Sequence, residues 1–225
     1  MPLPLSRRLN ISGDQTKQFK EMEAEFILVG GAAAVLQGYK RTTTDVDTLI
    51  RSQTVLDSLE SVEGFEVVAG RLSYRSVIID LLTTIDDRFT YSQVDGYVRY
   101  VHGVPVLQPE YALSVKIRCF YLRSEDSNGL EKQLTDLMDA VFWAKAMKEA
   151  GKTISNTCAT LFQIGCYHAV LVRLKLEPDD FEILVDVGFG RLIIPWEENT
   201  PEQREYYYSL FAPEGTDLLT VPLDN

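Results

Sequence analysis

The chain has little cysteine, little histidine and no long apolar run, and each shortage excludes a class of protein. Its three cysteines, Cys119, Cys158 and Cys166, have apolar neighbours and lack metal-ligand spacing, so we expect buried free thiols rather than a metal site. The two histidines, His102 and His168, have no nucleophile or ligand nearby in the sequence, and we expect ordinary structural roles for them.

A membrane or secreted protein is not expected either. No stretch approaches the roughly 18 consecutive apolar residues of a membrane span. The apolar run at the N-terminus is too short for a signal peptide. We therefore expect no membrane partner and a cytoplasmic location, with a nuclear location as the alternative.

Acidic residues outnumber basic ones by 33 to 22, and they are unevenly placed. Residues 176–225 hold 12 of the acidic residues and only two of the basic ones, so nearly all of the net charge of −11 lies there. Such a surface repels a polyanion, so bulk nucleic-acid binding is not expected, although a local basic groove is compatible with it. The acidic segment is either a solvated face that aids solubility or part of an interface for a protein partner.

The most informative stretch is a short apolar run, then two glycines, an alanine-rich helix former and two alternating carboxylates. The run Phe26–Val29 predicts a buried strand. Gly30 and Gly31 let the backbone turn sharply and approach a ligand without a Cβ in the way. Asp45 and Asp47 are two residues apart in a second predicted strand, so their side chains share one face.

Two ionised carboxylates side by side repel each other unless a cation lies between them. Mg²⁺ suits such a place, because it prefers oxygen ligands and usually shares them with substrate phosphates. The diglycine turn, which opens a helix, offers free backbone N–H groups to a phosphate. The motif therefore predicts that one half binds a triphosphate and the other half binds its metal ion.

This order of features resembles the signature of the DNA polymerase β-type nucleotidyltransferase superfamily. Within it, the run Arg41-x-Thr43-x-Asp45-Val46-Asp47 is similar to the version in small bacterial nucleotidyltransferases of toxin–antitoxin systems and in their fungal relatives. That family has a third carboxylate on a neighbouring strand, and Asp80, a lone charge in an apolar strand, is the candidate. The alternatives are a βαβ unit with a surface acidic pair, and a decayed member that binds nucleotide without catalysis.

The resemblance implies Mg²⁺-dependent transfer of a nucleoside monophosphate from an NTP to a hydroxyl, with release of pyrophosphate. By resemblance, Asp45, Asp47 and Asp80 bind the metal ions, and Asp80 also helps to deprotonate the acceptor. Gly30 and Gly31 hold the phosphates. The acceptor stays open among a protein side chain, a small molecule and an RNA end.

A second similarity to those relatives lies after the core, where Lys116, Arg123 and Asp136 follow in the order of their pattern. By resemblance, Lys116 faces the triphosphate and Asp136 orients it. The alternative is an ion pair between these two residues that only staples two helices. Arg41, with Thr43 beside it, contacts either phosphate or solvent.

Periodicity places strands in the first half of the chain and helices in the second. We expect strands at 26–30, 45–51, 65–69, 73–83, 96–101 and 104–107, and helices after Gly30 and at 16–25, 52–61, 109–120, 130–150, 155–174, 178–187 and 201–211. The predicted fold is α+β, with a mixed-sheet nucleotidyltransferase core over residues 1–107 and a helical C-terminal part over 108–225.

Two further expectations concern the helical part. The helix at 130–150 is expected to bury an apolar face made of Leu134, Leu137, Met138, Val141, Phe142 and Ala144. A non-catalytic binding or regulatory module, acting through a protein interface on the acidic C-terminal helices, is the second hypothesis for function.

Overall fold

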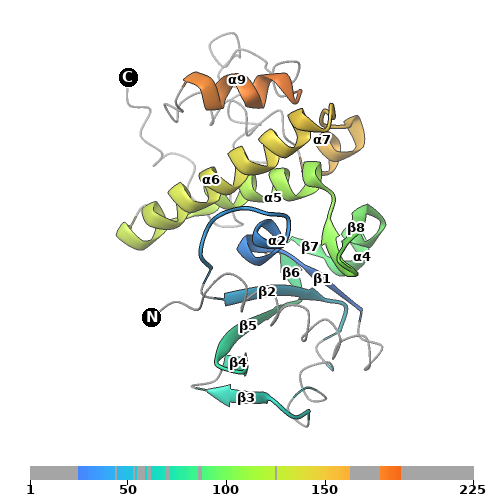
Figure 1. Ribbon diagram of the computed structural model, residues 1–225, viewed down its shortest axis with the longest axis vertical. Helices are drawn as coiled ribbons and strands as arrows, with labels where there is room; N and C mark the ends of the chain where they lie inside the picture. Colours follow the sequence, from blue (N-terminus) through green and yellow to red (C-terminus); the bar gives the residue numbers. More distant parts are fainter. Residues whose placement is uncertain are drawn as a thin grey trace, which may run out of the picture. The chain divides into compact units, whose positions relative to one another are not determined.

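The computed structural model describes residues 25–43, 45–52, 54, 59, 62–68, 71–85, 88–124, 126–162 and 178–188. Its helices and mixed sheet confirm the predicted α+β fold (Figure 1). The chain divides into two compact units, one up to Thr153 and one from Ile154. The predicted boundary between residues 107 and 108 falls inside the first unit. The predicted helices at 16–25 and 201–211, most of those at 52–61 and 155–174, and most of the acidic segment lie outside the described residues.

The first unit is built on a seven-stranded mixed sheet with the order β3-β4-β5-β2-β1-β9-β8. Its strands are β1 (Phe26–Leu28), β2 (Asp45–Ile50), β3 (Phe65–Val68), β4 (Arg71–Tyr74), β5 (Val77–Leu82), β8 (Val98–Val101) and β9 (Val104–Leu107). In the middle of the sheet β2 runs parallel to β5 and antiparallel to β1. Between β5 and β8 lie a two-stranded sheet, a short helix and a 3₁₀ turn: β6 (Thr84–Ile85), β7 (Phe89–Thr90), α4 (Tyr91–Val94) and η1 (Asp95–Tyr97).

The single strand predicted at 73–83 is wrong, because the structure has a hairpin there. β4 and β5 are joined by Arg75 and Ser76, which have φ angles of 49° and 68°. Positive φ at both central residues is the geometry of the tight turns that match strand twist. Glycine or asparagine usually occupies such positions, so an Arg-Ser turn gives no sequence signal. The antiparallel pairing of β4 with β5, continued along both strands, places Arg71 opposite Asp80.

Among the described residues of the first unit, the longest helices are α2 (Gly30–Leu36), α5 (Pro109–Leu122) and α6 (Ser127–Glu149). α2 contacts both β2 and α6, and α5 packs along α6 (Figure 1). Pro109 begins α5 as predicted. α6 begins three residues earlier than predicted, since the side chain of Asp126 caps it by accepting a hydrogen bond from the Gly129 N–H at 2.7 Å.

The second unit contains α7 (Asn156–Phe162) and α9 (Pro178–Asp186) among its described residues. Pro178 begins α9, and Gly188, with a φ of 110°, follows its end, both as predicted. In the described part of the chain, no helix is long and apolar enough to cross a membrane.

The face that α6 buries differs from the predicted one. Leu134 and Met138 are 64% and 59% exposed, whereas Asp136 and Asp139 are buried. The other four predicted members of the face are buried or partly buried. The acids can be buried because α5 brings the ammonium group of Lys116 to both of them, so that neither charge is left uncompensated.

Candidate functional site

The three candidate metal ligands lie on two adjacent strands. β2 pairs in parallel with β5 so that Asp47 is in register with Asp80. Asp45 and Asp47 are both partly exposed, whereas Val46 and Thr48 beside them are buried. The two carboxylates of β2 therefore share one face, as the alternation predicts, and the carboxylate of β5 stands next to them.

The surroundings of Asp47 disfavour its charged form. Burial and then the negative charge of Asp45 raise the pKa of Asp47 to about 6, and Asp80 adds to the effect. Lys116 and Arg123 act in the opposite direction. A carboxylate in this position is destabilised in its charged form, and a cation that bound here would relieve the repulsion. The donor set, three carboxylates, is of the kind that Mg²⁺ prefers.

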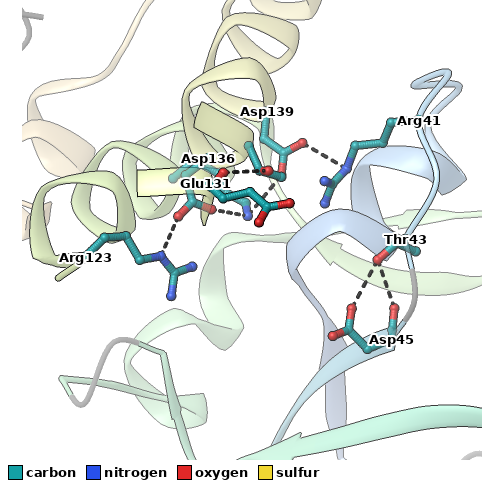
Figure 2. Close-up of polar contacts among 9 residues, drawn as sticks. Arg41, Thr43, Asp45, Arg123, Glu131, Asp136 and Asp139 are labelled. Carbon is teal, nitrogen blue, oxygen red and sulfur yellow. Dashed lines mark hydrogen bonds and ion pairs between the residues drawn. The ribbon is translucent and has the colours of Figure 1, made fainter. Parts of the chain in front are cut away.

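Two of the three carboxylates are already engaged by neighbours. Nη2 of Arg71 donates hydrogen bonds to Oδ1 and Oδ2 of Asp80, at 2.8 and 2.6 Å. The hydroxyl of Thr43 donates to Oδ1 of Asp45 at 3.2 Å (Figure 2). Within the described ranges, no three acidic, histidine or cysteine side chains are gathered closely enough to hold a metal ion. Asp80 is thus paired with Arg71 and 30% exposed, so it is not the lone charge that its apolar strand indicates.

The diglycine turn lies directly against this cluster. Gly30 has a φ of +64°, and a Cβ at this position would overlap Oδ2 of Asp47. Glycine is therefore required both by the backbone conformation and by the approach of the carboxylate. A Cβ on Gly31 would overlap Nη2 of Arg41, so the guanidinium group of Arg41 also lies against the turn.

Replacing Gly30 with alanine is expected to lower the free energy of unfolding by about 1–3 kcal/mol, because alanine resists positive φ and its methyl group displaces Asp47. Gly31→Ala is the matched control. Its φ is not positive, so alanine there adds no backbone strain, and its methyl group meets only the guanidinium group of Arg41. Chemical denaturation measures both variants, and equal losses would contradict the special role of Gly30.

A buried network of ions lies beside the carboxylates (Figure 2). Nζ of Lys116 lies 2.7 Å from Oδ1 of Asp136 and 2.9 Å from Oδ2 of Asp139. Nε of Arg123 donates to Oδ2 of Asp136 at 2.8 Å. Nε of Arg41, from the segment before β2, lies 3.1 Å from Oδ1 of Asp139. The network joins α5, α6 and the segment that leads into the carboxylate strand.

The network shows that the ion pair between Lys116 and Asp136 joins two helices. Burial opposes the charged form of Lys116, but Asp136 and Asp139 together outweigh it and raise its pKa above the ordinary value. The same lysine lines a cavity of about 10 Å³ with Gly30, and its charge reaches Asp47. The ammonium group of Lys116 thus lies near Gly30, and the contact of this lysine with a triphosphate stays a prediction.

For two residues of this region, Arg71 and Asp139, the sequence did not lead to a predicted role. Asp139 follows Asp136 by three positions, so helical spacing places both on one face, and this signal could have identified it. Arg71 can be recognised as the partner of Asp80 only when the hairpin of β4 and β5 is known, because their contact depends on the register of these two strands.

No protein-family model and no curated protein sequence matches the chain. Among solved structures, it is similar to an antigenic nucleotidyltransferase-like protein from Paracoccidioides brasiliensis, with a TM-score of 0.59 and 19% sequence identity. The similarity covers 83% of this chain and 95% of that protein. At this level of identity the likeness concerns the fold: the chain has the fold of a nucleotidyltransferase-like protein.

Proposed function

We propose that the protein is a Mg²⁺-dependent nucleotidyltransferase that moves a nucleoside monophosphate from an NTP to a hydroxyl acceptor. The observation that supports it most is the register of Asp47 with Asp80, with Asp45 on the same face and Gly30 pressed against Asp47. The likeness of the fold to a nucleotidyltransferase-like protein is independent support.

In this proposal Asp45, Asp47 and Asp80 bind the metal. Mg²⁺, when bound, neutralises phosphate charge and stabilises the attacking and leaving oxygens of an in-line displacement. Asp80 accepts the proton of the acceptor hydroxyl while the hydroxyl oxygen bonds to the α-phosphorus. The bond from the α-phosphorus to the bridging oxygen of the β-phosphate breaks, and pyrophosphate leaves.

The cations beside the cluster have the task of holding the phosphates. Arg41 is restrained by Asp139, with its guanidinium group against the diglycine turn, where a phosphate would approach. Lys116 is restrained by Asp136 and Asp139 and shares a cavity with Gly30. Charges fixed before the substrate arrives need little reorganisation during the reaction, which favours catalysis.

The direct test is incubation with each labelled NTP, Mg²⁺ and candidate acceptors of the three classes. Asp80→Asn is expected to lower the single-turnover rate by on the order of 10²–10⁴, because the proton acceptor is lost, and to weaken NTP binding less. Asp126→Asn is the control, since asparagine caps α6 equally well. An unchanged single-turnover rate in Asp80→Asn would count against the assignment.

A second candidate function, a non-catalytic module that binds a protein partner, is favoured by a different observation. Leu130, Leu134 and Met138 lie four residues apart on α6 and are 51%, 64% and 59% exposed. Side chains at this spacing form one stripe, and exposed apolar stripes mark interaction surfaces. Calorimetric titration with each NTP separates the two functions, because the enzyme requires Mg²⁺ for tight binding and the module does not.

A further inference from the structure

The pairing of Arg71 with Asp80 occupies a carboxylate that the proposed metal site needs. One guanidinium nitrogen of Arg71 donates to both oxygens of Asp80. Their side chains are 48% and 30% exposed. The pair therefore lies on the solvent side of the cluster, where the arginine can turn away without leaving a cavity in the core.

The positive charge of Arg71 interacts with all three acids of the cluster. The hydrogen bond and charge of Asp80 raise the pKa of Arg71 most, and the charges of Asp45 and Asp47 add to the effect. A divalent cation among the same three acids would repel the guanidinium group and would need the same oxygens of Asp80. The arginine and the metal ion are therefore competitors for this carboxylate.

We propose that Arg71 exchanges partners during the reaction cycle: it holds Asp80 before the metal binds and contacts the triphosphate once Mg²⁺ has taken Asp80. This inference rests on the proposed function. Arg71 begins β4, directly across from Asp80, so a displaced side chain still ends beside the cluster. The triphosphate oxygens bring the nearest new negative charge, and a planar guanidinium group matches phosphate geometry.

The exchange predicts effects of opposite sign in Arg71→Gln. Calorimetric titration with Mg²⁺ alone is expected to show about two- to fivefold tighter binding, because one exposed ion-pair competitor is removed. Titration with an NTP in saturating Mg²⁺ is expected to show binding weaker by on the order of tenfold, because a charged phosphate contact is lost. Arg71→Lys keeps the positive charge but lacks the planar guanidinium group. The lysine should therefore still compete with Mg²⁺ for Asp80, but it should bind the triphosphate more weakly than arginine does.

Arg51→Gln is the matched control. Arg51 is also an exposed arginine paired with an acid, Glu25, but it follows the other end of β2. This variant is expected to leave both affinities unchanged. Arg71→Gln with unchanged or weaker Mg²⁺ binding, or with unchanged NTP binding, would show that Arg71 only stabilises the hairpin, and the inference would fail.

Failure of the inference differs from failure of the proposed function. If Mg²⁺ binds the wild-type chain and Asp47→Asn abolishes this binding, the metal site stands, and an ineffective Arg71→Gln overturns only the exchange. If neither the wild-type chain nor Arg71→Gln binds Mg²⁺, with or without an NTP, both proposals fail together.

Discussion

Asp47→Asn is expected to abolish nucleotidyl transfer and, at the same time, to stabilise the metal-free protein at neutral pH. Transfer should fall by on the order of 10³-fold or more, because the residue at the centre of the proposed metal site is lost. The free energy of unfolding should rise by about 1–3 kcal/mol, because asparagine removes a charge that burial and Asp45 disfavour. A loss of activity with a gain of stability is the signature of a site kept for function.

The difference in stability between the wild-type chain and Asp47→Asn depends on pH, and the raised pKa of Asp47 sets its direction. Asp47 has a pKa of about 6 in the folded chain, above its ordinary value of 3.8. The folded state therefore holds the proton more tightly than the unfolded state, so stability falls as the pH rises from about 4 to 6. The advantage of Asp47→Asn should be absent near pH 4, grow across this window and stay constant above it.

Thermal denaturation at several pH values, with and without Mg²⁺, measures both effects. Mg²⁺ is expected to raise the melting temperature of the wild-type chain and to have little effect on Asp47→Asn. Asp126→Asn, an exposed substitution at the N-cap of α6, should respond to Mg²⁺ like the wild-type chain. The metal assignment would be refuted by full transfer activity in Asp47→Asn, and the electrostatic argument by a lower stability of this variant at pH 7.5.

Asp139→Asn is expected to destabilise the first unit strongly. Asp139 is fully buried, and its carboxylate lies within ion-pair distance of Lys116 and Arg41. The neutral amide leaves Arg41 without its buried counter-charge and Lys116 with Asp136 alone. Removing one partner of a buried ionic network typically costs about 3–5 kcal/mol, which corresponds to a fall in melting temperature of about 6–20 °C for a protein of this size.

The melting temperature is again measured against Asp126→Asn, at the exposed N-cap of the same helix, which should change stability by at most about 1 kcal/mol, because asparagine still caps the helix and only a charge at its N-terminus is lost. Arg41→Gln removes the cation of the ion pair between Arg41 and Asp139. It should lower the free energy of unfolding by less than Asp139→Asn does, because Arg41 is partly exposed. A melting temperature of Asp139→Asn within a degree or two of the wild type would mean that the network contributes little to folding.

Local rules were sufficient to predict the shared face of Asp45 and Asp47 and the turn at the two glycines. Alternation alone puts Asp45 and Asp47 on one face of β2. The glycines identify the turn because Gly30 adopts a conformation that other residues avoid. The pairing of β2 with β5 came from a resemblance, and the register of Asp47 with Asp80 is in agreement with it.

Other features depend on contacts between distant segments, which local patterns do not contain. The hairpin at Arg75 and Ser76 uses residues that rarely adopt positive φ, so nothing in the sequence divides β4 from β5. The buried face of α6 is set by the position of Lys116 on α5 and not by the apolar periodicity of the helix. Asp136 is buried because it pairs with Lys116, whereas Leu134 is exposed. Tertiary pairing thus overrides the hydrophobic pattern on this helix.

The long helix α6 has two faces of different chemistry. Asp136 and Asp139 point inward to the cations beside the site, and Leu134 and Met138, about half a turn away, point to solvent. A partner seated on the apolar side would press on the helix that restrains Arg41 through Asp139. Because Arg41 precedes Asp45 by four residues, this one ion pair ties α6 to the segment that leads into the carboxylate strand.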